Sequence, residues 1–145
     1  MRTVLLCLLA LSPVAACGGS SWGTEMVLET PFSKATMFRG PNVEQSVAEA
    51  AFEAMVEANY NFASGLGEQV DRVDGRLTLR LALDNEDTIT SIEADGEKDA
   101  AVSYHRGLAA QVSRAVGGEP VDIVLCKFSL DRPFYTVAWP AEAAD

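Results

Sequence analysis

One stretch of eight residues alternates strictly between leucine and other side chains. Every second residue from 77 to 83 is leucine, and Arg76, Thr78, Arg80 and Ala82 stand between them. Because successive side chains of a strand point to opposite faces, this period of two predicts a strand with one face in the core and the other toward water. The Asp74-Gly75 pair before it is typical of a turn.

Two further segments have the apolar spacing of amphipathic helices. The first follows Asn42, which with Gln45 fits a capping box, and runs to about Gly65. Its apolar or small face comprises Val43, Val47, Ala50, Ala51, Ala54, Met55, Ala58 and Phe62. The second helix ends at the Gly117-Gly118-Glu119-Pro120 stop signal. Its apolar face comprises Ala101, His105, Leu108, Ala109, Val112, Ala115 and Val116.

Five other segments are interpreted as strands or turns. An acidic turn over residues 84–87 predicts that residues 88–94 return as a strand, forming a hairpin with residues 76–83. Residues 121–130 and 134–139 are apolar and predict two more strands. Residues 24–39 predict a short strand followed by a loop, because Pro31 interrupts the run.

These elements predict one α+β domain over residues 24–140, with two helices packed on one face of a mostly antiparallel sheet of three to five strands. If residues 24–39 form a strand, this two-layer sandwich resembles a ferredoxin-like split β-α-β arrangement. If they do not, the segment from Gly75 to Asp84, with alternating leucines, an acidic turn and a returning strand between two helices, resembles the C-terminal domain of TonB and its AgmX/PglI relatives. That resemblance implies a fold and no particular function.

The N-terminus has the three parts of a secretory signal. Arg2 is followed by an apolar run over residues 4–11 and then by small residues. The run is well short of the roughly 20 residues that a spanning helix needs. We therefore expect residues 1–16 to be a cleaved signal peptide.

Val14-Ala15-Ala16-Cys17 resembles the lipobox of bacterial lipoproteins. The resemblance implies cleavage after Ala16, a thioether-linked diacylglycerol on Cys17 and an acyl chain such as palmitate on its amine. Two or three chains suffice for stable anchoring. Because Gly18 rather than aspartate follows, the resemblance favours the outer over the inner membrane. An ordinary cleaved signal with an incidental cysteine is the alternative.

The expected mature chain is acidic and keeps one cysteine besides the lipidated one. Without residues 1–16 it has 129 residues and a formal net charge of −11. That charge argues against nucleic acid and against docking on anionic lipid through the protein surface. Residues 17–23 read as the lipidated N-terminus and a flexible tether, in which Trp22 is exposed, lies at the membrane interface or packs on the domain. Residues 141–145 read as a loose acidic tail. Cys7 leaves with the signal, and Cys126, within an apolar run, is expected to be buried.

The sequence shows no recognisable active site. It lacks a Gly-x-Ser-x-Gly elbow, a His-Glu-x-x-His helix, a Cys-x-x-Cys pair and a phosphate-binding glycine loop. His105 is the one histidine, and its place on an apolar helix face predicts a partly buried, hydrogen-bonded side chain. We therefore assign no catalytic, cofactor or metal residues and expect no enzyme.

Acidic residues offer a weaker signal for cations. Glu49, Glu53 and Glu57 lie one helical turn apart, and two acidic turns span residues 84–87 and 95–99. The second turn fails the register of an EF-hand, since alanine stands where glycine is required and arginine where the bidentate glutamate should be. We expect solvated carboxylates at all three places.

Together these features predict a lipid-anchored, non-enzymatic cell-envelope protein whose domain binds another envelope protein or helps to assemble an envelope complex. The last strand, residues 134–139, could lie at a sheet edge and accept a partner strand. The alternative is a periplasmic or surface lipoprotein that binds a small ligand or a divalent cation through its acidic turns or glutamate row.

Overall fold

The computed structural model describes residues 22–29, 34–62 and 67–140. The expected signal peptide, Cys17 and the acidic tail lie outside the described residues. The elements in chain order are β1 (Thr24–Glu29), β2 (Lys34–Arg39), α1 (Gln45–Glu57), β3 (Glu68–Val73), β4 (Arg76–Leu83), α2 (Glu86–Asp95), a short 3-10 helix η1 (Gly96–Lys98), α3 (Ala100–Ala115), β5 (Val121–Lys127) and β6 (Pro133–Trp139).

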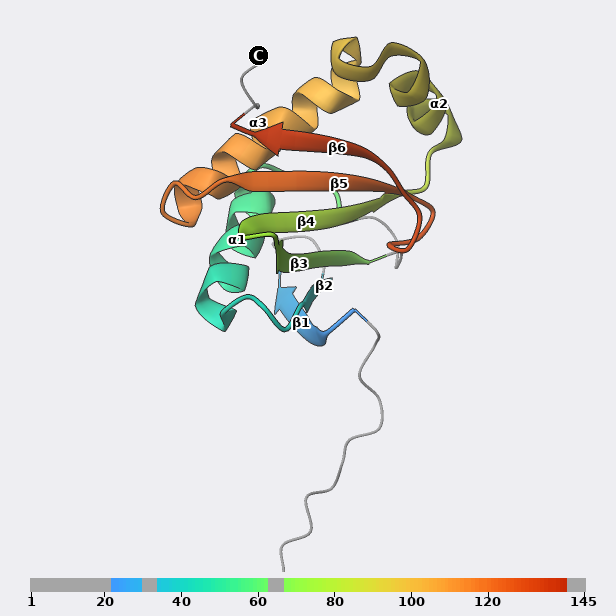
Figure 1. Ribbon diagram of the computed structural model, residues 1–145. Helices are drawn as coiled ribbons and strands as arrows, with labels where there is room; N and C mark the ends of the chain where they lie inside the picture. The colour runs from blue at the N-terminus through green and yellow to red at the C-terminus, as the bar shows by residue number, and fades with distance from the viewer. Residues whose placement is uncertain (1–21, 30–33, 63–66, 141–145) are drawn as a thin grey trace, which may run out of the picture.

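The six strands form one sheet in the order of the sequence. The pairs β1–β2, β3–β4 and β5–β6 are antiparallel, whereas β2–β3 and β4–β5 are parallel. Each parallel pair is joined by a helical crossover, as parallel neighbours require. Helix α1 contacts β2 and β3, and α3 contacts β5, β6 and α1, so both cover the same face (Figure 1).

The α+β class is confirmed, but three details of the expected fold are wrong. The described sheet has six strands rather than three to five, it is mixed rather than mostly antiparallel, and α2 is an additional helix. In a split β-α-β unit another strand separates the two that the helix joins. Here the strands joined by each crossover are direct neighbours, so the arrangement is not ferredoxin-like.

The predicted strand at residues 88–94 is a helix. Helix α2 buries Ile89 and Ile92, which are three residues apart, and its N-cap residue Asn85 accepts a hydrogen bond from the backbone N–H of Thr88 at 2.9 Å. Two acidic residues in the first turn add favourable charge at this end. The antiparallel partner of β4 is β3 instead. Residues 88–94 therefore do not form the returning strand that the resemblance to the TonB C-terminal domain implies.

Helix α1 begins and ends inside its predicted bounds. Its N-cap is Glu44, which makes no side-chain cap bond, so the predicted capping box of Asn42 and Gln45 is wrong. Asn42 binds Asp71 of β3, and Gln45 donates to Glu49 at 2.7 Å. The predicted apolar face is confirmed for the buried Ala51, Ala54 and Met55.

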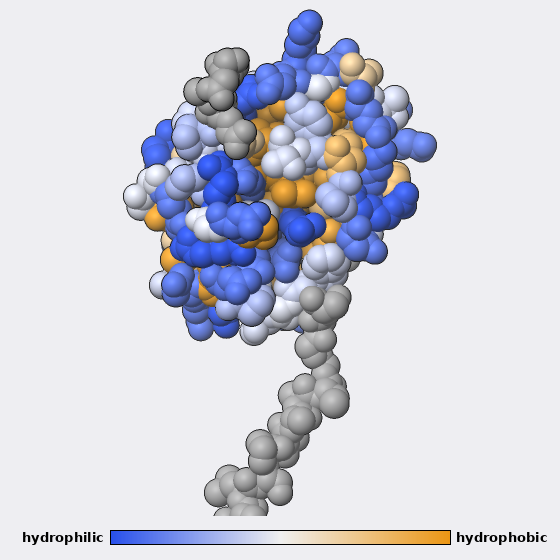
Figure 2. Space-filling view, in the orientation of Figure 1, coloured by the Kyte–Doolittle hydropathy of each residue, from blue (hydrophilic) through white to orange (hydrophobic). Residues whose placement is uncertain are grey.

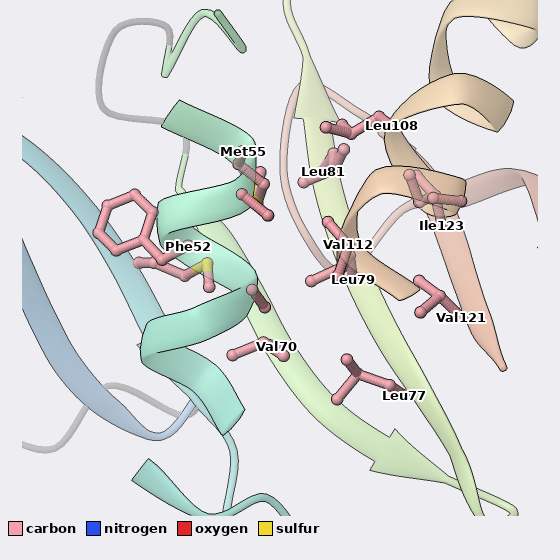
Figure 3. Close-up of a cluster of buried hydrophobic side chains, with 14 of the residues drawn as sticks. Phe52, Met55, Val70, Leu77, Leu79, Leu81, Leu108, Val112, Val121 and Ile123 are labelled. Carbon is pink, nitrogen blue, oxygen red and sulfur yellow. The ribbon is translucent and has the colours of Figure 1, made fainter. Parts of the chain in front are cut away.

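The predicted burial of the leucine stripe of β4 is confirmed. Leu77, Leu79 and Leu81 are fully buried in a cluster with residues of α1, α3 and β5 (Figure 3). The other face of β4 does not simply meet water, because Thr78 is only 5% exposed.

Strand β3 was missed, and residues 24–39 form two strands instead of one. The six residues of β3 include four polar or charged ones, which hide the strand pattern, although Glu68 and Gln69 are buried. Strand β1 pairs with β2 from Thr24 opposite Arg39 to Glu29 opposite Lys34. Pro31 lies outside the described residues. In the described part of the chain, no helix is long and apolar enough to cross a membrane.

Candidate functional site

The two large helices leave one face of the sheet uncovered. Figure 2, which looks onto this open face, shows apolar residues near its centre within a margin of polar ones. Val27 of β1 and Val73 of β3 lie on it and are 55% and 44% exposed. The open face is therefore amphipathic rather than uniformly solvated.

A pocket of about 490 Å³ lies where the chain enters the sheet, beside β3 and β4. Its lining comprises Trp22, Gly23, Thr24, Arg39, Gly40, Pro41, Gln69, Asp71, Val73, Thr78 and Arg80. The register of β3 and β4 explains part of this set, because Gln69 is opposite Arg80 and Asp71 is opposite Thr78. Residues that face each other across two strands share one face of the sheet.

One lining side chain, that of Gln69, is held by a hydrogen bond to the start of the described domain. The side-chain amide of Gln69, which is 8% exposed, donates to the backbone oxygen of Trp22 at 2.8 Å. This bond fixes the start of the domain against β3. Trp22 is partly buried and lines the pocket, so of the three positions considered for it the structure has it packed on the domain.

Asp71 closes the pocket on the side of residues 40–42. Its carboxylate accepts hydrogen bonds from the backbone N–H of Asn42 at 3.0 Å and of Arg72 at 2.8 Å. Gly40 lies so close that a Cβ there would be 2.1 Å from Cγ of Asp71. The charge of Asp71 is therefore engaged in holding the loop between β2 and α1.

The pocket contains the two partly buried cations of the described domain that have no carboxylate partner. Six basic side chains are partly buried among the described residues. Four have a carboxylate partner, in the pairs Arg72–Glu119, Arg76–Asp122, Arg106–Glu97 and Lys127–Glu93. Within the described part of the chain, the other two, Arg39 and Arg80, have no carboxylate within 4.0 Å. Both line this pocket.

Each of these arginines has a neutral contact. Nη1 of Arg39 donates to the backbone oxygen of Val43 at 3.0 Å. Arg80 interacts with the thiol of Cys126 on β5, which is buried as predicted. Burial raises the pKa of Cys126, and the charge and hydrogen bond of Arg80 oppose that rise. This environment favours the thiol over the thiolate, so Cys126 is not an activated nucleophile.

His105 has the structural role that the sequence predicts. It is 5% exposed, and its Nδ1 lies 2.6 Å from the backbone oxygen of Ala101. Because a carbonyl can only accept, Nδ1 carries the proton in this bond. Burial lowers the pKa of His105, while the bond to Ala101 acts in the other direction. The ring is therefore neutral at pH 7.

The acidic turns and the glutamate row do not come together. Asp99 is the N-cap residue of α3. Its carboxylate accepts hydrogen bonds from the hydroxyl of Ser91 and from the backbone N–H of Ala101, the latter at 2.7 Å, and these bonds lower its pKa. Glu49 accepts from Gln45, and Glu53 is exposed. Among the described residues, no group of three His, Cys, Asp or Glu side chains is placed to hold a metal ion.

A buried acid that the sequence did not single out lies on the helix side of β3. Glu68 is 4% exposed, and burial raises its pKa to about 7. Nearby Tyr60 also has a raised pKa, first through its own burial and then through the charges of Glu68, Tyr104 and Asp84. Glu68 and Tyr60 are thus two acidic groups whose protonated forms are favoured by burial.

Comparison with known proteins found no match: no protein-family model, curated protein or solved structure is significantly similar to this chain. The candidate site therefore rests on the geometry of the open face and of its edges. Sequence reasoning placed Arg80 on the outer face of its strand but missed the pocket. The one available signal was Arg80, an arginine inside a strand whose alternate residues are leucines.

Proposed function

We propose that this is a lipid-anchored, non-enzymatic protein of the bacterial cell envelope whose domain binds a partner protein by strand addition at β6. The resemblance of residues 14–17 to a lipobox supports the anchor on Cys17, and Gly18 favours the outer membrane. The observation that carries the binding function is the character of β6 as a sheet edge.

Strand β6 is a long edge strand without charged side chains. It pairs with β5 alone among the described strands, and its seven residues, Pro-Phe-Tyr-Thr-Val-Ala-Trp, carry no charge. Natural proteins usually protect such edges with charges, because unpaired backbone groups attract other strands. The opposite edge, β1, has Glu25 and Glu29. An uncharged edge is therefore the better acceptor for a partner strand.

The edge is also held in shape before any partner arrives. Helix α3 packs beneath β6, Val137 is buried in the core, and Tyr135 and Trp139 pack against it. The backbone oxygen of Trp139 accepts a hydrogen bond from Arg76 at 3.3 Å. A strand fixed in this way loses little conformational entropy when a partner binds.

The proposed anchor and the proposed binding edge lie at opposite sides of the sheet. The chain enters the sheet at β1, and Trp22 is five positions after Cys17, a distance of at most about 18 Å when fully extended. Strand β6 is the far edge, about 24 Å across the sheet at the usual strand spacing. A lipid on Cys17 would thus hold β1 toward the bilayer and leave β6 accessible.

The chemistry of the edge and the charge of the chain define the partner. The side chains of β6 itself are uncharged and, apart from Thr136, apolar or aromatic, whereas the whole chain has a formal net charge of −10. The partner is an extended, apolar segment of another envelope protein with basic flanks. Its association should weaken as salt screens the attraction.

A photo-crosslinking amino acid at residue 136 tests this proposal in membranes of cells that make the full-length protein. Thr136 is exposed on β6, and matched control positions are Val27 on β1 and Ser103 on α3. We expect a discrete adduct at residue 136 that is absent at both controls and in a Cys17→Ala background. Purified complex should also show slowed hydrogen exchange at β6 amides. Equal adducts at all three positions, or unchanged exchange in β6, would contradict strand addition.

A further inference from the structure

The pocket on the open face has its own ligand chemistry, separate from the β6 edge. We propose that it binds a small organic molecule with a single carboxylate, which pairs with Arg80 and Arg39. The two arginines come from different strands, and both reach the same pocket of about 490 Å³. This inference does not depend on the proposed binding of a partner at β6.

The first argument is the unequal pairing of charge. The chain has 21 acidic and 11 basic residues, and each other partly buried basic side chain of the described domain has a carboxylate partner. Arg39 and Arg80 have none among the described residues. Partial burial of a guanidinium costs free energy unless an anion compensates it. A ligand carboxylate would supply that compensation.

The second argument concerns geometry and hydrogen-bond capacity. A guanidinium has five N–H donors in a planar fork that suits the two oxygens of a carboxylate. Arg39 uses one nitrogen for the backbone oxygen of Val43 and keeps further donors. Thr78, 5% exposed, lines the pocket wall and donates its hydroxyl to the backbone oxygen of Arg76 at 3.4 Å, and Gln69 anchors Trp22 through its amide. The site is thus largely formed without its ligand.

The third argument limits the class of anion. Asp71 is also in the lining, so the pocket has two positive groups and one negative group. A monocarboxylate brings this set of charges to neutrality, whereas a doubly charged phosphate would leave one negative charge uncompensated beside Asp71. The volume lies within the usual range for small-molecule sites, about 300–1,000 Å³, and exceeds what a carboxylate alone would fill. Trp22 and Val73 offer apolar contact to the rest of the ligand.

Benzoate and inorganic phosphate serve as probes for nuclear magnetic resonance titration of the nitrogen-15-labelled, full-length mature protein in a neutral detergent at constant ionic strength. We expect benzoate to shift the Trp22 indole and Gln69 amide signals saturably, and phosphate to give no saturable shift over the same range. Arg80→Gln should weaken benzoate binding by about tenfold or more, because a charge-assisted hydrogen bond is lost. Arg114→Gln removes the same charge at an exposed position of α3 and should leave the affinity unchanged.

Three results would overturn the proposal. They are shifts that grow linearly with benzoate, an equal affinity in Arg80→Gln and Arg114→Gln, and phosphate binding as tight as that of benzoate. If Arg80→Gln does not fold, Arg39→Gln provides the test, because Arg39 lies at the end of β2. Its affinity for benzoate should also fall, and an unchanged affinity there would count against the site.

Discussion

At the scale of single residues, the buried Glu68 couples the stability of the fold to pH. A glutamate normally indicates an exposed position, yet this one shares the core-facing side of β3 with Val70. Among the described residues, no basic side chain lies within 4.0 Å of it. Burial of the charged form is unfavourable, so the folded protein holds the proton up to a pH of about 7.

The buried acid predicts a pH dependence of stability. The unfolded chain releases this proton near the ordinary value of 4.5, and the folded chain near 7. As the pH rises between these values, the free energy of unfolding falls, and above pH 7 the decrease reaches about 3 kcal/mol. Urea unfolding of the wild type and of Glu68→Gln from pH 4.5 to 8 measures this decrease. The free energy of unfolding of the wild type should fall relative to that of the variant over this interval. A constant difference would show that Glu68 ionises normally.

At the scale of elements, the sequence predicts those helices and strands whose apolar residues recur at a regular spacing. Strand β4 and helix α3 were located correctly because the leucine alternation and a face containing Leu108 and Val112 match the periods of strand and helix. Strand β3 was missed because its polar residues, such as Gln69, are buried by contacts that only the fold creates. The pocket escaped for the same reason, since Trp22 and Arg80 meet through pairing of distant segments.

Helix α2 was mistaken for a strand because two isoleucines in a short segment do not fix the period. Its cap provides a test. Asn85→Ala removes the acceptor for the Thr88 N–H and should lower the free energy of unfolding by about 1 kcal/mol. Exposed Asn61→Ala is the matched control and should change stability by less than about 0.5 kcal/mol. Equal effects in urea unfolding would argue against the helix cap.

The contact between the β2–α1 loop and β3 gives a second prediction at this scale. Gly40→Ala should destabilise the protein by about 1–3 kcal/mol, because its Cβ would overlap the Asp71 side chain. Gly107→Ala is the control, since nothing lies within 4 Å of a Cβ there. In the interior of α3 this change should stabilise by roughly 0.5–1 kcal/mol. Thermal unfolding of both variants measures these opposite changes in stability. Destabilisation of similar size in both variants would contradict the packing described.

At the scale of the whole molecule, we propose that the N-terminus holds the α+β domain at a membrane. The sheet order supports a division of roles, with the entry of the chain at β1, a charged pocket beside it and an uncharged edge at β6. All of these roles depend on the location of the protein. If Cys17 carries no lipid, the proposed orientation relative to a bilayer loses its basis.

The most direct test is the intact mass of the protein purified from membranes, beside a Cys17→Ala version, with fractionation of both. We expect the wild type to begin at Cys17, to have the added mass of a diacylglyceryl group and an acyl chain, and to remain with the membrane. The variant should lack this mass and leave the membrane fraction. A wild type that is unlipidated and released from membranes would contradict the account.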